Sequence, residues 1–372
     1  MIHERIKKVR HNLNQNGLGG LLVSSPVNCF YLTEFEKPNG DFRAIQLLVL
    51  PHQTYIFTNP LYEGSVRSWR GAVEASKETT RVIVTSPKRG LTDHLQQICQ
   101  ENEIGVLGFE EKDLRLAEYR RLEKKLEGIK LQPADVIFAN LRKIKNPEEI
   151  EKIRMAVALT DAAFSHILKI IKSGLSEKDI ATEIDYFMRK NGAEESAFQT
   201  IVASGPNSAI PHHKTGDRRL ENGEAVLLDF GARYQGYCAD MSRTIFLGPA
   251  KRTELAAYQH VFEAQEAALK GIRLGLNGAQ ADGIARNYLK KHHLGQYFVH
   301  NLGHNLGLEI HESPSLGPGG KEKIEPNMVF SVEPGVYFPG KFGIRIEDLV
   351  LAQKSGLELL SQSTKNLLTI HN

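Results

Sequence analysis

The first 139 residues of the chain alternate between short apolar runs and amphipathic segments. The apolar runs are rich in branched residues and predict strands at Leu21–Ser24, Ile45–Leu50, Thr54–Thr58, Val82–Val84 and Ile104–Gly108. The amphipathic segments predict a helix that ends at Gly17 and further helices at Pro26–Leu32, Leu61–Val66, Leu91–Glu101 and Leu114–Leu126. Such alternation is typical of an α/β layer with a mixed sheet.

A strong helix start follows at the segment LRKIKNP, residues 141–147. Asn146 suits the N-cap, Pro147 suits the first helical position, and Glu149 completes the spacing of a capping box. Apolar residues then recur at helical spacing until Gly174 ends the run. The change of pattern predicts two domains, at residues 1–139 and 140–372.

The second part contains a weak internal repeat. A helix begins at Ser176 after a Gly-Leu pair at 174–175, and another begins at about Ala279 after a Gly-Leu pair at 275–276. The order helix, Gly-Leu, helix, strand therefore occurs twice. This order suggests a pseudo-twofold domain with helices outside and strands around a central site.

Two stretches of the second part predict β-hairpins, because each has two apolar runs around a turn that contains glycine: residues 225–246 and 327–351. Asp229 and Asp240 lie on the two arms of the first and would be directly opposite if its turn is centred between Tyr234 and Gln235. Opposed like charges are destabilising, so a cation between them would favour the arrangement. Two solvated strand aspartates would explain the first hairpin alone equally well.

The second hairpin repeats the arrangement of carboxylates. Glu333 and Glu347 are symmetric about Gly340, and Arg345 shares a strand face with Glu347. His304 lies between the two hairpins in the sequence. Four carboxylates and one imidazole suit Mn, Co or Zn better than thiolate-seeking metals, and they could hold two ions. Paired ions are a recurring device for hydrolysis.

Composition narrows the possible partners. The chain has 372 residues, is 41% apolar and 24% charged, and carries a net charge of +3 without a dense basic run, which argues against nucleic acid as the main partner. Its three cysteines are widely spaced, as in a protein with reduced thiols. No stretch reaches ~18 uninterrupted apolar residues, and the N-terminus lacks the apolar core of a signal peptide. We therefore expect no membrane association and a cytoplasmic location.

The order and context of these residues resemble the pita-bread metallopeptidases, in the prolidase and aminopeptidase P branch. The resemblance covers nearly the whole chain and rests on the motifs PHH, GHNLGLEIHE, VEPG and GIRIED together with Asp229, Asp240, His304, Glu333 and Glu347. It implies an α/β N-terminal domain like that of creatinase and prolidase. The remainder would be an α+β catalytic domain with a pseudo-twofold, a central antiparallel sheet and helices outside. Members commonly form homodimers, and we expect one here.

The resemblance also assigns roles. It implies two divalent ions, with manganese favoured and cobalt or zinc possible, held by Asp229, Asp240, His304, Glu333 and Glu347. It implies catalytic roles for His212, His300, His311, Glu333 and Arg345. Glu34 stands where the family pattern has glycine, and Ser315 stands where some prolidases have the arginine that binds the free carboxylate of a dipeptide.

The implied activity is hydrolysis of Xaa-Pro bonds in small peptides with proline at the second position, either as an aminopeptidase or as a dipeptidase. The departure at Ser315 favours the aminopeptidase. A non-catalytic peptide-binding module or a creatinase-like hydrolase on the same fold is the alternative. Both alternatives are disfavoured because all five metal ligands are present.

Overall fold

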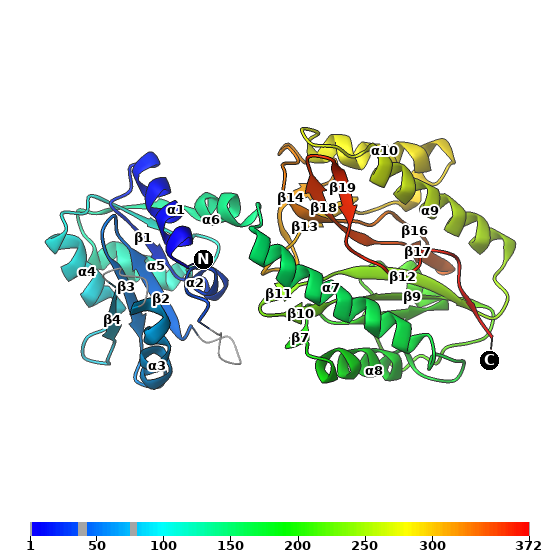
Figure 1. Ribbon diagram of the computed structural model, residues 1–372, viewed down its shortest axis with the longest axis horizontal. Helices are drawn as coiled ribbons and strands as arrows, with labels where there is room; N and C mark the ends of the chain where they lie inside the picture. The colour runs from blue at the N-terminus through cyan, green and yellow to red at the C-terminus, as the bar shows by residue number, and fades with distance from the viewer. Residues whose placement is uncertain (1, 36–42, 75–79, 372) are drawn as a thin grey trace. The chain divides into compact units, whose positions relative to one another are not determined.

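The computed structural model describes residues 2–35, 43–74 and 80–371. Its chain separates into two compact units, Met1–Leu141 and Arg142–Asn372. Each unit has a core and sheets of its own (Figure 1). The two-domain architecture expected from the sequence is thus confirmed.

The first unit is built on a six-stranded sheet with the order β4-β3-β2-β1-β5-β6. Its strands are β1 (Gly20–Val23), β2 (Ile45–Val49), β3 (Thr54–Thr58), β4 (Thr80–Val84), β5 (Val106–Phe109) and β6 (Lys130–Pro133). The pairs β1–β2 and β2–β3 are antiparallel and the others are parallel, so the sheet is mixed, as predicted. The sequence missed β6, because this half-exposed edge strand has no apolar run.

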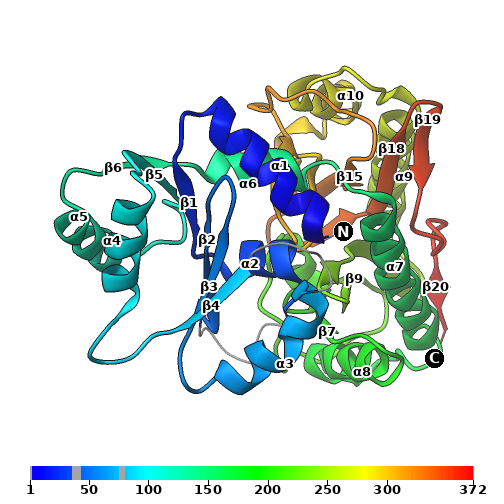
Figure 2. The same ribbon diagram turned by 60° about the vertical axis from the view of Figure 1, so that its left-hand side comes forward.

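Helices cover both faces of this sheet (Figure 2). The helices are α1 (Ile2–Gln15), α2 (Pro26–Thr33), α3 (Glu63–Glu74), α4 (Leu91–Glu101), α5 (Leu116–Lys125) and α6 (Asp135–Arg142). Glu34 follows α2 with φ of 53°, in the left-handed region that favours glycine. The backbone at this position thus explains why the family pattern has glycine there.

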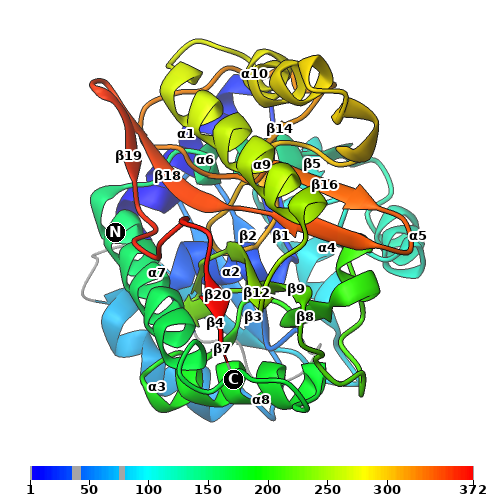
Figure 3. The ribbon, with the colours of Figure 1, turned by 90° about the vertical axis from the view of Figure 1, so that its right-hand side faces the viewer.

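The second unit places helices outside its strands (Figures 1 and 3). The helices are α7 (Pro147–Ile167), α8 (Glu177–Lys190), α9 (Arg252–Gly271) and α10 (Gly278–Lys291), with short 3-10 helices η1 (Gly205–Ala209) and η2 (Gly295–Tyr297). Helices α7 and α8 share one hydrophobic core with β9 (Glu224–Phe230) and β12 (Met241–Leu247). Helices α9 and α10 share another with β15 (Val329–Val332) and β18 (Asp348–Gln353).

The strands of the second unit form four sheets, with the orders β20-β12-β9-β8, β14-β13-β15-β18-β19, β11-β10-β7 and β16-β17. The remaining strands are β7 (Glu195–Ser196), β8 (Ile201–Ser204), β10 (Ala232–Tyr234), β11 (Tyr237–Cys238), β13 (Gly303–Asn305), β14 (Glu312–Leu316), β16 (Gly335–Phe338), β17 (Phe342–Arg345), β19 (Gly356–Leu359) and β20 (Thr369–Ile370). The pairs are antiparallel apart from β12–β20.

The internal repeat is present in the backbone. Gly174 donates its N–H to the carbonyl of Leu220, and Gly275 donates to Ile324, both at 2.9 Å. The two glycines have φ of 88° and 87°, a left-handed conformation that disfavours other residues. The second residue after each glycine is the N-cap of the next helix, α8 or α10. The two halves of the unit therefore use the same helix-to-helix connection, as the repeat predicted.

The predicted register of the first hairpin is wrong. Asp229 is paired with Ser242, so Asp240 is its diagonal neighbour on the same face and is not directly opposite. The turn fixes this register, because Gln235 and Gly236 have φ of 46° and 81° and match the two central positions of a primed two-residue turn. The prediction placed the turn one residue too early.

The second hairpin has the predicted symmetry. Val332 pairs with Asp348 in the ladder between β15 and β18, and Gly335 pairs with Arg345 in the ladder between β16 and β17. The same register extends across the gap between the two ladders. Glu333 and Glu347 lie between the two ladders, and the shared register directs both side chains toward one site.

Candidate metal centre and substrate pocket

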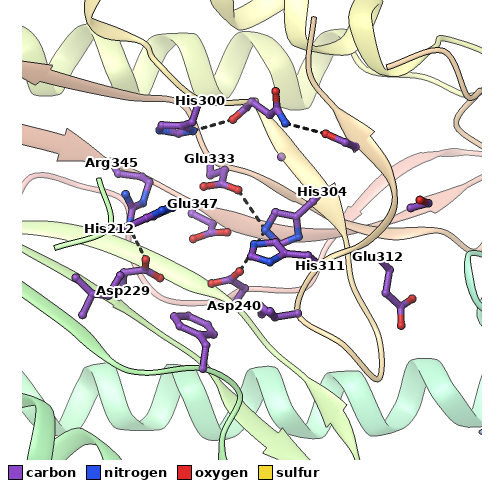
Figure 4. Close-up of a pocket in the computed structure, with 17 residues that line it drawn as sticks. His212, Asp229, Asp240, His300, His304, His311, Glu312, Glu333, Arg345 and Glu347 are labelled. Carbon is purple, nitrogen blue, oxygen red and sulfur yellow. Dashed lines mark hydrogen bonds and ion pairs between the residues drawn. The ribbon is translucent and has the colours of Figure 1, made fainter. Parts of the chain in front are cut away.

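A pocket in the second unit collects every site residue predicted from the sequence (Figure 4). Its lining includes Asp229, Asp240, His304, Glu333, Glu347, His212, His300, His311 and Arg345. These side chains come from both halves of the unit, so the hairpins of the repeat meet at this pocket. Figure 4 shows the carboxylates facing the histidines across it.

Asp240, His304 and Glu347 form the tightest group. One ligand atom of each lies within 4.8 Å of the others, a spacing that suits a shared metal ion. The Nε2 atom of His304 is 3.6 Å from Asp240 Oδ2 and 3.4 Å from Glu333 Oε1. The Oε1 atom of Glu347 is buried without a hydrogen-bond partner, although buried polar atoms almost always have one. A bound cation would supply the missing partner.

The electrostatics of the pocket also fit a cation. Burial raises the pKa of the Asp240 and Glu347 carboxyls well above the usual range, and the neighbouring carboxylates raise it further. Burial raises the pKa of Glu333 to about 7. Buried carboxylates without enough positive charge repel one another, and divalent ions would remove that cost. The donor set of oxygen atoms and one imidazole suits Mn, Co or Zn.

His304 has the protonation state that a ligand needs. Burial, followed by the neighbouring His311, lowers the pKa of His304 to about 4, so the imidazole is neutral at pH 7. A neutral ring can offer a nitrogen lone pair to a metal ion. The rings of His304 and His311 meet edge to face, with centroids 4.4 Å apart.

Asp229 differs from the other carboxylates because it is paired with a guanidinium. Arg345 Nη2 donates to Asp229 Oδ2. Burial raises the pKa of Asp229, while the charge of Arg345 opposes the shift. The second oxygen of Asp229 is not engaged by that ion pair, which leaves Asp229 able to serve as a metal ligand at the margin of the group.

Arg345 also connects several groups around the centre. It donates to Ser242 Oγ at 2.7 Å and to Tyr337 Oη at 2.8 Å. Ser242 Oγ in turn donates to Glu347 Oε2 at 2.8 Å, and Tyr337 Oη is 2.9 Å from His300 Nε2. Partners of this kind fix the orientation of metal ligands. Arg345 therefore holds side chains of both hairpins in place.

The sequence analysis did not identify two serines that donate hydrogen bonds to carboxylates of the pocket. Ser242 is bonded to Glu347, and Ser331 Oγ donates to Glu333 Oε1 at 3.1 Å. A signal did exist for both, since Ser331 is two residues from Glu333 on one strand face and Ser242 is two residues from Asp240. Without the register of the sheets, such serines cannot be told from ordinary strand residues.

Comparison with known proteins identifies this arrangement. Residues 151–354 match the model of metallopeptidase family M24, and residues 5–144 match the creatinase/prolidase N-terminal domain. The Xaa-Pro dipeptidase of Pyrococcus furiosus is 32% identical over 370 residues, which cover 98% of this chain and 99% of that protein.

Solved structures agree in fold over nearly the whole chain. The Xaa-Pro dipeptidase from Bacillus anthracis superposes with a TM-score of 0.90 at 34% identity, covering 99% of this chain and 100% of that one. The X-Pro aminopeptidase from Thermotoga maritima MSB8 superposes with a TM-score of 0.83 at 33% identity, covering 95% and 98%.

The chain belongs to metallopeptidase family M24. It is therefore a metallopeptidase with the pita-bread fold, and the non-catalytic binding module considered above is not supported. The family implies divalent metal ions as cofactors. No helix within residues 2–35, 43–74 and 80–371 is both long enough and apolar enough to cross a membrane.

Proposed function

We propose that the chain is an exopeptidase that hydrolyses the peptide bond before proline, using two divalent ions held in the pocket. The observation that carries the proposal is the group of Asp240, His304 and Glu347, with its unpartnered carboxylate oxygen and neutral imidazole, in a chain of family M24. Relatives named Xaa-Pro dipeptidase and X-Pro aminopeptidase support the substrate class.

The proposed ligand roles rest on the resemblance to family M24, and the grouping of Asp240, His304 and Glu347 supports them. Asp229, Asp240, His304, Glu333 and Glu347 would together hold the two ions. Manganese is the expected metal, with cobalt or zinc as substitutes. When bound, such ions polarise the scissile carbonyl and make water a stronger nucleophile near neutral pH.

The side chains around the ions would transfer the proton, stabilise the negative charge on the carbonyl oxygen and position the groups of the cleft. Glu333, which lines the pocket beside His304, would take a proton from the attacking water and pass it to the leaving nitrogen. His311 or His212 would donate a hydrogen bond to the oxygen of the scissile carbonyl as negative charge develops there. His300 and Arg345 hold the cleft in shape through Tyr337.

We further propose that the pocket prefers peptides longer than two residues. A dipeptide places its free carboxylate beside the scissile bond, where a cation would bind it most strongly. Among the described lining residues Arg345 is the one permanent cation, and it already bonds to Asp229 and Tyr337. At the position expected for an arginine, Ser315 accepts a 2.9 Å hydrogen bond from Asn301. We therefore favour an Xaa-Pro aminopeptidase over a strict dipeptidase.

A peptide panel tests this function. Metal-stripped protein reloaded with Mn²⁺ should release the first residue of Ala-Pro-Ala and should cleave Ala-Pro and Gly-Pro more slowly, as measured by chromatography of the products. Ala-Ala-Ala is the matched control and should be cleaved poorly. Cleavage confined to the dipeptides would contradict the length preference, and no cleavage of any proline peptide would contradict the function.

The variant Ser315→Arg tests the length preference by introducing the arginine that some prolidases have at this position. An arginine there would offer a charge-assisted partner to a dipeptide carboxylate, a bond that contributes roughly 1.5–3 kcal/mol, or about tenfold to a hundredfold in kcat/KM. The ratio of Ala-Pro to Ala-Pro-Ala hydrolysis should rise by that factor. An unchanged ratio would show that this position does not contact the substrate carboxylate, and Ser315→Lys controls for the charge alone.

Two further features are proposed on the resemblance. We expect a homodimer, which sedimentation or light scattering would measure. We also expect a cytoplasmic location, with which the free, buried state of Cys29, Cys99 and Cys238 is compatible.

A further inference from the structure

The segment that carries His212, residues 204–216, is hydrogen-bonded to one buried carboxylate both before and after His212. Glu177, the first residue of α8, is fully buried. Its Oε1 atom accepts hydrogen bonds from the backbone N–H of Ser204 at 2.8 Å and from Asn207 Nδ2 at 2.9 Å. Its Oε2 atom lies 2.8 Å from His213 Nε2 and accepts from the N–H of Gly216 at 3.3 Å. Residues before and after His212 thus share one anchor.

The carboxyl group of Glu177 is stabilised in its ionised form. Burial raises the pKa of Glu177, but the hydrogen bonds from Asn207, Ser204 and His213 outweigh it and hold the pKa below the usual value. The carboxylate is therefore ionised at neutral pH and can accept all of these bonds at once. His213 is itself mostly covered, with 12% of its side chain exposed.

The opposite side of the segment is held by the second hairpin, residues 327–351. Arg345 donates to the carbonyl oxygen of Pro211 at 3.2 Å, and the N–H of Gly343 donates to Ser208 Oγ at 2.9 Å. His212 follows Pro211 directly, so one neighbour of His212 is bonded to Arg345 and the other to Glu177. The backbone of His212 is consequently fixed between α8 and the second hairpin.

We infer that Glu177 and His213 are positioning residues for His212: together they fix the loop that presents its imidazole to the substrate. The inference rests on the proposed function, because it needs His212 to contact substrate. It gives His213, a histidine that touches neither metal nor substrate in this account, a role in turnover. Such supporting partners typically contribute roughly tenfold to a hundredfold to activity.

A double-mutant cycle on the manganese-loaded enzyme tests the inference with Ala-Pro-Ala as substrate. His213→Ala should lower kcat/KM about tenfold with the bound manganese unchanged, and His213→Gln, which can still donate to Glu177, should restore most of it. In a His212→Ala background, His213→Ala should cause no further loss, because residues that act through one another are not additive. Glu177→Gln should behave like His213→Ala.

The pair His166–Glu183 provides a matched control. It joins α7 and α8 by a similar 2.7 Å contact but is more exposed, and neither residue lines the pocket. His166→Ala should leave kcat/KM unchanged in both backgrounds. Equal losses from His213→Ala with and without His212, or no loss in the wild type, would overturn the inference. Full activity of His212→Ala would instead overturn the proposed role of His212, and the inference with it.

Discussion

Glu347→Gln should abolish turnover of Ala-Pro-Ala and, at the same time, make the metal-free protein more stable. Activity should be lost because Gln replaces a carboxylate proposed to hold the ions, and the loss should exceed the roughly tenfold to hundredfold effect of losing an outer partner. Stability rises because burial and neighbouring carboxylates raise the pKa of Glu347, so its ionised form opposes folding at neutral pH. Hydrolysis assays and thermal unfolding without metal measure the two effects.

The expected rise in Tm is a few degrees, since one kcal/mol corresponds to roughly 2–4 °C for a unit of this size. Ser242→Ala is the matched control, because it removes the hydrogen bond to Glu347 and keeps the charge. It should lower activity by about tenfold to a hundredfold and should not stabilise the metal-free protein. A metal-free Glu347→Gln protein that is less stable than the wild type would show that Glu347 is a structural carboxylate.

Glu312→Gln should strongly destabilise the second unit. The side chain of Glu312 is 6% exposed and accepts bonds from two buried cations, Arg142 Nε at 3.2 Å and Lys145 Nζ at 3.1 Å. It also accepts the N–H of Leu308 at 3.1 Å and so holds the loop that leads to His311. Burial opposes its ionisation, but the two cations hold its pKa below the usual value. Arg142 keeps its ion pair with Glu309, but removing the charge of Glu312 takes away the carboxylate paired with the buried Lys145, at a cost of about 3–5 kcal/mol in the free energy of unfolding.

Urea unfolding of the metal-free protein measures this loss. Arg154→Ala is the control, because Arg154 forms a 2.6 Å ion pair with Glu358 in which both side chains are about one-third exposed. That exposed pair should contribute about 0–1 kcal/mol. A loss below 1 kcal/mol for Glu312→Gln would contradict the account of Glu312 as the anchor of the His311 loop.

The sequence predicted the second hairpin well and the first less well, for a reason visible in the turns. Symmetry about Gly340 gave the correct register in the second, where that glycine has φ of 70°. In the first, symmetry of the aspartates was the wrong guide, because Gln235 and Gly236 set the turn one residue later. Turn chemistry decides register more reliably than the placement of functional residues.

The supporting residues around the site could not be predicted. Glu312 is bonded to residues about 170 positions earlier in the chain, and Glu177 is bonded across 27 to 39 positions. In the sequence Glu177 appears as an ordinary glutamate at a helix start, and Glu312 ends the motif GHNLGLEIHE without a role of its own. Their roles depend on which loops the fold brings over them, which periodicity and motif spacing do not encode.

The central claim is a two-ion centre that drives cleavage before proline. The most direct measurement is the rate of Ala-Pro-Ala hydrolysis as Mn²⁺ is added stepwise to metal-stripped protein. The account predicts no hydrolysis without metal and a maximum rate at two equivalents bound. Full activity in the metal-free protein, or a maximum at one equivalent, would contradict it.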